Sequence, residues 1–402
     1  ADTGETVPGQ ILVAWDPAWA TIPISDLAES GLDEDRASQT WQDAHNELSK
    51  LSGLEVLDIT PDYGIGLLAV ADGQESAEIE RLSRLPWVRY AEPNYVAHAA
   101  GYPNDPFIGD QWNLRRVGAP AAWDITKGSY SIVVSLIDSG IDSTHPEFSG
   151  RVQLGYDYVN LDYDPSDDYG HGTHVAGIVA AATDNATGIA GLAPNVRILP
   201  LNVLIQVGSG SYANIATAIR RAADSAAQVI NVSLGGTSYS QSLCDAVTYA
   251  ESKGALVVAA AGNCAMGGSE CGGVANPSFY PAACNGALAV GATDHMDGWA
   301  GYSGYKSYVD ISAPGGTSSD QVWSTLPGSY GFRYGTSMAT PLVSGTAALI
   351  WTLQPLYTPA QVADLIQNTA DKVGAFTYTS GRNDYYGYGR LNVLRALRWA
   401  SQ

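Results

Sequence analysis

The chain has 402 residues, 45% of them hydrophobic, a length that suits two or three globular domains of ~150 residues each. Its 41 acidic residues outnumber its 20 lysines and arginines, and the net charge of −21 argues against nucleic acid or an anionic membrane as a partner, because phosphates would repel it. No apolar run approaches the ~20 residues of a membrane span.

Residues 1–100 form the first predicted domain. Up to residue 98 this segment holds eighteen acidic and five basic residues, so most of the negative charge lies in it. Hydrophobic periodicity predicts strands at 10–15, 54–59, 64–70 and 88–96 and helices at 33–51 and 75–85. This β-α-β-β-α-β order is that of a small α+β ferredoxin-like domain. The small residues and proline of segment 98–103 predict an exposed linker after it.

Residues 101–402 form the second predicted domain. Short, almost wholly apolar runs predict buried strands at 131–137, 198–203, 229–233 and 255–260. Helical patterns separate them at 174–182, 214–227 and 242–253. Apolar strands alternating with helices indicate an α/β fold with a parallel sheet covered on both faces. In such sheets functional residues gather at the carboxyl ends of the strands.

The four cysteines lie in one stretch of about forty residues: Cys244, Cys264, Cys271 and Cys284. An even, clustered set is typical of two disulfides formed in an oxidising compartment. Zinc is the alternative, but the chain has no Cys-x-x-Cys pair and no histidine at a suitable spacing. We therefore expect two disulfides, in any of the three pairings that four cysteines allow.

Four polar side chains occur at predicted strand ends or helix starts. Asp138 directly follows the run 131–137, His171 lies between two glycines before a small-residue helix, and Asn263 follows another buried strand. Ser337 begins an apolar helical run, where free N–H groups and the positive end of the helix dipole favour a developing oxyanion. Together they supply an orienting acid, a base, an oxyanion donor and a nucleophile.

Each signal also has a plainer interpretation. Asp138 suits a turn, a single histidine is more often structural, and Ser337 suits a helix N-cap. We assign that structural role to His174, which falls inside the predicted helix. For the others the chain order Asp, His, Ser favours catalysis, since it is one of the three orders known for this triad.

Residues 102–402 resemble the subtilisin family of serine proteases, and its thermitase-like branch most closely. The similarity is carried by stretches 137–141, 170–177, 230–236, 260–263, 335–341 and 388–392. Residues 10–98 resemble the inhibitory propeptide of the family in pattern and position. The resemblance implies a subtilisin-like fold with a parallel, seven-stranded type of sheet flanked by helices, preceded by the propeptide domain.

The resemblance also assigns roles. It implies that Asp138 orients His171, that His171 takes the proton of Ser337, and that Asn263 holds the oxyanion. Two segments would form the walls of the substrate cleft and Phe279 the floor of its primary specificity pocket, which would favour small or medium side chains. The implied substrate-binding residues are Ser233, Leu234, Gly235, Ala260, Gly262, Phe279 and Thr336.

The resemblance implies calcium as the cofactor. Carboxylate and carbonyl oxygens are the ligands that calcium prefers. The family's strong site matches Asp105, Glu147, Ala182, Asn185, Thr187 and Ile189, with Glu147 in place of the usual aspartate. A second calcium loop is suggested by Asp157, Asn160, Asp162, Asp164 and Asp167, and the alternative for this loop is a solvated acidic segment.

Taken together, the sequence predicts a secreted, monomeric serine endopeptidase that hydrolyses proteins and peptides. Its own propeptide would act as an intramolecular inhibitor, with residues 95–100 leading into the cleft and self-cleavage near 98–101. Two rivals are a catalytically silent binding or inhibitory module and a peptidase with exopeptidase specificity. The filled catalytic positions argue against the first, and nothing in the sequence suggests a blocked cleft for the second.

Overall fold

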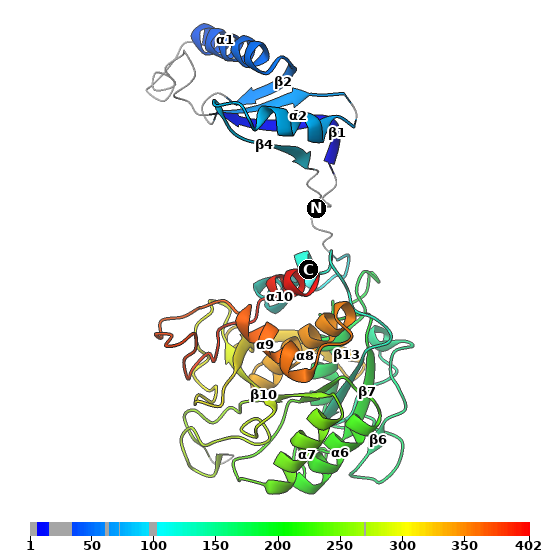
Figure 1. The fold of residues 1–402 in the computed structure, drawn as a ribbon. Coiled ribbons are helices and arrows are strands. Elements are labelled where there is room, and N and C mark those ends of the chain that lie inside the picture. Colours follow the sequence, from blue (N-terminus) through cyan, green and yellow to red (C-terminus); the bar gives the residue numbers. More distant parts are fainter. Residues whose placement is uncertain (1–5, 16–33, 61–63, 72, 96–102, 269–270) are drawn as a thin grey trace. The chain divides into compact units, whose positions relative to one another are not determined.

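The computed structural model describes residues 6–15, 34–60, 64–71, 73–95, 103–268 and 271–402 (Figure 1). The contacts divide the chain into two compact units, Ala1–Ala99 and Ala100–Gln402. Each unit has a hydrophobic core of its own, and each is described by itself. The predicted linker at 98–103 lies almost wholly outside the described residues.

The first unit is a four-stranded sheet with two helices. Its elements are β1 (Thr6–Trp15), α1 (Glu34–Ser52), β2 (Glu55–Thr60), β3 (Ile65–Ala69), α2 (Glu75–Leu82) and β4 (Val88–Tyr95). The strands pair antiparallel in the order β2-β3-β1-β4, which is the ferredoxin-like order. Ile11 and Val13, two residues apart on β1, are both fully buried, as the two-residue period of a strand requires.

The second unit is built on a seven-stranded sheet in the order β11-β10-β9-β8-β5-β7-β6. Its strands are β5 (Val133–Asp138), β6 (Tyr156–Asp157), β7 (Arg197–Asn202), β8 (Val229–Val232), β9 (Leu256–Ala260), β10 (Ala287–Thr293) and β11 (Ile311–Pro314). Every neighbouring pair is parallel, which confirms the predicted fold class. All six residues of β5 are buried, because helices cover both faces of this strand.

Two helical layers sandwich this sheet (Figure 1). Val134 and Leu136 pack into a core with α5 (His171–Ala180) and α8 (Thr336–Leu353). The alternate residues Val133 and Ile137 pack into a second core on the other face. That face is covered by α6 (Tyr212–Asp224) and α7 (Gln241–Ser252). Further helical elements are η4 (Ile108–Asp110), α3 (Trp112–Arg116), α4 (Ala119–Ala122), η5 (Pro146–Phe148), α9 (Pro359–Asn368) and α10 (Val393–Ala400).

The strand order reverses at β5. This strand pairs with β7 on one side and with β8 on the other, so the chain winds outward in both directions from it. The crevice at the carboxyl end of such a strand is where ligands bind in open α/β sheets. Asp138 is the last residue of β5, and β8 and β9 end beside it at the same edge.

A hairpin of β12 (Val322–Leu326) and β13 (Ser329–Arg333), which the sequence did not predict, docks on α5. The Ser324 hydroxyl donates to the His174 carbonyl and the Thr325 hydroxyl to the Thr173 carbonyl, both at 2.7 Å. The chain leaves β13 and enters α8 within a few residues. The hairpin therefore packs on α5, which begins at His171, and leads directly into α8, which carries Ser337.

Both predicted disulfides are present. Cys244 of α7 bonds to Cys284 before β10, and Cys264 bonds to Cys271, which closes a loop directly after Asn263. The pairing is decided by which cysteines the fold brings together. None of the helices in the described ranges has the length and apolar character needed to cross a bilayer.

Candidate active site

Asp138 and His171 face each other at the carboxyl edge of the sheet. Nδ1 of His171 lies 2.7 Å from Oδ1 of Asp138, and the two side chains are 1% exposed for the aspartate and 16% for the histidine. Because a carboxylate only accepts, the proton of the neutral ring stays on Nδ1 and the lone pair of Nε2 remains free. The Ser139 N–H also donates to Asp138 Oδ1 at 2.8 Å and fixes the carboxylate. In this arrangement His171 can act as a base, and the Asp138 carboxylate holds its ring in one tautomer.

The loop before α5 is organised by Asp167. Oδ1 of Asp167 accepts from Gly170 N, Tyr169 N and the Ser139 hydroxyl, and Oδ2 accepts from the N–H and hydroxyl of Thr173. Five donors thus satisfy this carboxylate at the N-terminus of the helix that carries His171. The sequence offered Asp167 as a calcium ligand, whereas the structure uses it to hold this loop to α5.

Gly172 allows α5 to approach the Asp138 loop. A Cβ at this position would lie 2.1 Å from the Gly140 carbonyl oxygen and 3.2 Å from the Asp138 Cβ. Any side chain here would push the helix away and lengthen the Asp138–His171 hydrogen bond. Gly172 is therefore required because the backbone of α5 lies close to the backbone at Gly140.

Ser337 is the second residue of α8, where helix amides have no intrahelical acceptor. Its hydroxyl donates to the Ser233 carbonyl at 2.9 Å, and the Ser233 hydroxyl donates to the Ser337 carbonyl at 3.0 Å. This reciprocal pair holds the start of α8 at the end of β8. The Ser337 proton must therefore change partner before His171 can accept it.

Asn231 supports this contact from within β8. It is fully buried, its Nδ2 donates to the Ser233 hydroxyl at 2.9 Å, and its Oδ1 accepts from the Ser344 hydroxyl at 2.8 Å. Sequence reasoning gave Asn231 no separate role. The sequence does contain one sign of it: Asn231 is a polar residue in an otherwise apolar strand. A buried polar side chain is tolerated there only when its polar atoms have hydrogen-bond partners.

Asn263 lies against the residue before Ser337. Its Oδ1 accepts from Thr336 N at 3.0 Å and from the Thr336 hydroxyl at 2.9 Å. Since a backbone N–H can only donate, these bonds fix the orientation of the amide and leave Nδ2 free to donate elsewhere. Gly335 has φ of +144°, and a Cβ there would lie 3.1 Å from Nδ2. Glycine thus keeps the space beside Nδ2 open.

Phe279 lies between the two predicted cleft walls. A Cβ on Gly235 would come within 2.6 Å of the Phe279 ring, and a Cβ on Gly262 within 2.7 Å. Two backbone hydrogen bonds between Gly236 and Tyr280, of 3.0 and 2.8 Å, hold the segment in this place. Leu234 packs at the edge of the second core, and Ala260 ends β9. The structure thus gathers the predicted substrate-binding residues around the ends of β8 and β9.

His174 has the structural role that its place in the helix suggested. It is fully buried, and its Nε2 faces the carbonyls of Val322 and Gly331 at 3.2 Å each. Burial is the main cause that lowers the pKa of His174 to about 3, and the positive charges of His171 and Arg333 lower it further. His174 is therefore neutral near pH 7, and it fastens the hairpin to α5.

The predicted first calcium site contains two buried carboxylates. Asp105 and Glu147 are 1% and 0% exposed, and neither makes an ion pair within the described residues. Glu147 accepts from Ile189 N and the Tyr330 hydroxyl at 3.0 Å and from Asn185 Nδ2 at 3.2 Å. Burial raises the pKa of both acids, and repulsion from Asp105 raises that of Glu147 further. Two buried carboxylates that lack an ion pair in the described residues fit a hard cation.

The predicted second calcium loop is arranged differently. Asp157 accepts from the N–H groups of Val159 and Asn160 and from the side-chain amides of Asn160 and Asn202. In the described ranges no three acidic, histidine or cysteine side chains gather as a metal-holding group. The four carboxylates of this loop are therefore not brought together, which favours the acidic-segment alternative.

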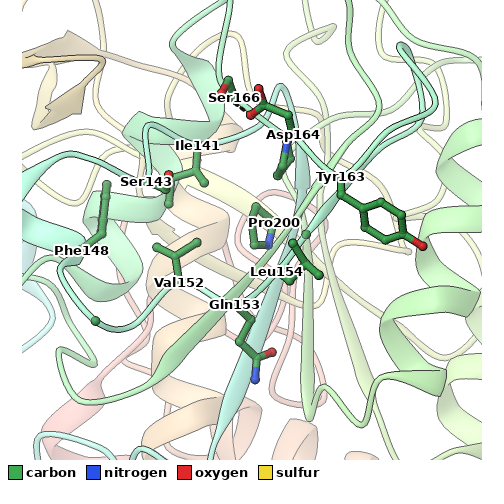
Figure 2. Close-up of a pocket in the computed structure, with 13 residues that line it drawn as sticks. Ile141, Ser143, Phe148, Val152, Gln153, Leu154, Tyr163, Asp164, Ser166 and Pro200 are labelled. Atoms are coloured by element: carbon green, nitrogen blue, oxygen red, sulfur yellow. Dashed lines mark hydrogen bonds between the residues drawn. The ribbon is translucent and has the colours of Figure 1, made fainter.

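A hollow of about 440 Å³ lies beside this acidic loop (Figure 2). Its lining mixes polar residues such as Gln153 and Asp164 with apolar ones such as Val152 and Pro200, and it contains none of the candidate catalytic residues. At its rim Asp164 accepts from the Ser166 hydroxyl at 2.6 Å, so this carboxylate turns back onto its own loop (Figure 2). The hollow is separate from the candidate active site.

Comparisons with known proteins identify the family of this chain. A family model described as "Subtilase family" matches residues 129–389. The chain is 45% identical to "Thermophilic serine proteinase" of Bacillus sp. (strain AK1) over 81% of this chain and 77% of the relative. It is 42% identical to "Thermitase" of Thermoactinomyces vulgaris over 74% of this chain and 99% of the relative.

A solved structure has a similar fold. It is described as proteases from Pseudoalteromonas arctica and superposes with a TM-score of 0.66 at 33% identity, covering 75% of this chain and 100% of the other. A second, titled "Crystal Structure of a Lanthipeptide Protease", gives a TM-score of 0.65 at 27% identity, covering 75% of this chain and 99% of the other.

Proposed function

The chain belongs to the subtilase family and is a serine endopeptidase of the thermitase-like branch, and on that premise we propose that Asp138, His171 and Ser337 are its catalytic triad. The observation that carries the proposal is the 2.7 Å contact between Asp138 and His171 at the sheet edge where Ser337, the second residue of α8, binds Ser233. Asn263 completes the group as the side-chain oxyanion donor.

The reaction follows from these positions. Nε2 of His171 accepts the proton of Ser337 as its Oγ attacks the carbonyl carbon of the scissile bond. The tetrahedral oxyanion accepts from Asn263 Nδ2 and the Ser337 N–H. His171 then donates its proton to the leaving amine, and the C–N bond breaks to give an acyl-enzyme. A water molecule, deprotonated by His171, releases the second product and restores the serine.

The test is covalent labelling. Purified chain treated with a serine-directed phosphonate or sulfonyl reagent should lose proteolytic activity, and peptide mapping should place the label on Ser337. Labelling of another serine, or loss of activity without a label, would contradict this assignment. A chain that is neither labelled nor able to cleave protein would favour the silent-module alternative.

The first unit is proposed to be an inhibitory propeptide. Its ferredoxin-like sheet, its position before the catalytic unit and its charge support this role. The predicted cleft-binding tail, residues 95–100, and the cleavage region 98–101 lie outside the described residues apart from Tyr95. Two disulfides support a secreted, extracellular enzyme, and we retain the monomer as its working state. Proteins and peptides are its substrates.

Phe279 is proposed to set the primary specificity. Its ring fills the space between the glycines of both walls, so little room is left for the side chain that precedes the cut. Glycine and alanine at that substrate position suit this geometry best. Pairing of an extended substrate with both predicted walls favours endopeptidase action over the exopeptidase alternative.

Shortening Phe279 should widen this specificity. In the series Phe279→Leu and Phe279→Ala, we expect kcat/KM for substrates with phenylalanine before the cut to rise stepwise relative to alanine substrates. For Phe279→Ala the rise should be about tenfold or more, since each buried methylene is worth ~1–3 kcal/mol. Matched peptides that differ only at this position would measure the ratio. If the ratio of kcat/KM for phenylalanine and alanine substrates stayed unchanged in both variants, Phe279 would not be part of the specificity pocket.

Calcium is proposed at Asp105 and Glu147, with Asn185 and the carbonyls of Ala182, Thr187 and Ile189 completing the ligands. The bound cation would supply positive charge that offsets the repulsion between the two buried carboxylates.

Calcium removal should therefore destabilise the fold. Chelation should lower the Tm by about 5–10 °C in scanning calorimetry, as expected for loss of a ligand present at ~100 times its Kd. The measurement uses a Ser337→Ala background to prevent self-digestion. Asp105→Asn should abolish the shift, while the control Asp162→Asn, in the acidic loop, should keep it. A Tm that is insensitive to chelation would contradict the site.

A further inference from the structure

Arg333 brings a positive charge to one side of His171. It is the last residue of β13 and precedes Ser337 by four positions, so the strand carries its side chain along the entry to α8. A Cβ atom added to Gly170 would lie 3.5 Å from Nη2 of Arg333. Gly170 is the N-cap of the helix that starts with His171. The guanidinium is thus next to the catalytic base in space.

Tyr169 connects the arginine to the histidine. The Arg333 guanidinium carbon lies 5.6 Å from the centre of the Tyr169 ring, and Nη2 donates to the Tyr169 carbonyl at 3.3 Å. The Tyr169 ring in turn stacks on the His171 ring, with centres 6.3 Å apart and planes inclined by 28°. A planar cation, a phenol and the catalytic imidazole therefore form one continuous wall.

The charge of Arg333 is not neutralised by the described part of the chain. It makes no ion pair there, and its Nε is buried without a hydrogen-bond partner. The nearby Asp167 carboxylate is fully occupied by its five hydrogen bonds. Arg333 thus keeps a positive charge near the proposed active site of a chain whose net charge is −21.

The hairpin does not depend on Arg333 to stay in place. The hydroxyls of Ser324 and Thr325 already bind it to α5, and the neutral His174 ring fastens it a third time. A purely structural role for the arginine is therefore weakly supported, and its charge is available for a substrate.

The position of His171 decides which part of the substrate this charge meets. The segment before the cut lies between the walls that end β8 and β9, next to Phe279 and Asn263. His171 donates its proton to the leaving amine, so the segment after the cut must pass the His171 side of Ser337. Because Tyr169 stacks on His171 and Arg333 lies over the Tyr169 ring, we place both residues on that side. We propose that Arg333, held by Tyr169, is a specificity residue that selects Asp or Glu in the first or second position after the scissile bond. This proposal rests on the catalytic function proposed above.

The test uses peptides with a fixed alanine before the cut and one varied position after it. The matched pairs are Asp against Asn and Glu against Gln, which differ in charge and hardly in shape. Wild type should cleave the acidic member with a kcat/KM about threefold to tenfold higher, the range for a partly exposed, charge-assisted contact. Arg333→Gln should bring the ratio to about one, and Arg333→Glu should invert it. Added salt at ~1 M should reduce the wild-type ratio.

The matched control is Arg398→Gln, which removes one positive charge from the exposed end of α10. This variant should keep the wild-type ratio, since a change in net charge alone acts equally on both members of a pair. Wild type that cleaves the neutral peptides but shows no acidic preference, or Arg333→Gln that keeps the preference, would overturn this proposal and leave the triad intact. A wild-type chain that cleaves no peptide would overturn the triad and this proposal with it.

Discussion

Ser337→Ala is expected to lower kcat by about 10⁶-fold, the size of the effect measured for the corresponding change in subtilisin, a relative of this chain. The alanine removes the atom that forms the acyl-enzyme, and His171 and Asp138 then have no proton to move. A residual rate over water should survive, because Asn263 and the cleft still bind the transition state. Hydrolysis of an alanine-containing peptide, followed by chromatography, measures the loss.

The same variant tests the proposed propeptide. Wild type should shorten on its own to about 300 of the 402 residues, whereas Ser337→Ala should remain whole. Ser401→Ala, an exposed serine at the end of α10, is the matched control and should process like wild type. A purified Ser337→Ala chain that still shortens would show that the cut does not depend on Ser337, and would contradict self-processing. Mass spectrometry of the products locates the bond.

Asn263→Ala is expected to lower kcat by about 10²–10³-fold with little change in KM. The figure is that for the oxyanion-hole asparagine of subtilisin, and it reflects one donor that is used only in the transition state. The geometry supports the role, since two bonds from Thr336 hold Oδ1 and leave Nδ2 free. Steady-state kinetics on a single peptide separate the two constants.

A control is needed because Asn263 also binds Thr336. Thr336→Val keeps the Thr336 backbone N–H and leaves Asn263 intact. It removes only the Thr336 hydroxyl, which is one of the two donors to Asn263 Oδ1. If Asn263 acts as an oxyanion donor, Thr336→Val should lose much less activity than Asn263→Ala. Equal losses in the two variants, or a loss carried by KM alone, would show that the asparagine acts by positioning Thr336.

Local sequence patterns predicted the frame of the molecule well. The apolar runs before Asp138 and through 255–260 became β5 and β9, and the helical patterns became α6 and α7 with ends shifted by one to three residues. Such runs are informative because burial on both faces leaves no polar position in a strand. The helix of His171 begins three residues earlier than its pattern indicated, because glycines hide the start of the periodicity.

Contacts between distant segments were harder to predict. β6 has two residues and β13 is exposed or half-buried along its length, so neither has an apolar pattern to recognise. The acidic loop is a further case, since its carboxylates left open both a cation site and a solvated acidic segment. In the structure Asp157 and Asp167 accept hydrogen bonds from their own surroundings, and no sequence spacing indicates which partner an oxygen will find.

The sequence alone determined the types of chemical group and the elements that carry them. A carboxylate after a buried strand, a histidine before a helix and a serine at a helix start are local features, and local features are set by neighbouring residues. Only the tertiary structure decided which groups meet. It paired Cys244 with Cys284, placed Phe279 between two distant glycines and set Arg333 over Tyr169, which stacks on His171. These contacts join residues that are far apart in the sequence. They depend on the order of the strands in the sheet and on the side of the sheet on which each connection passes, and both are decided only when the whole core packs.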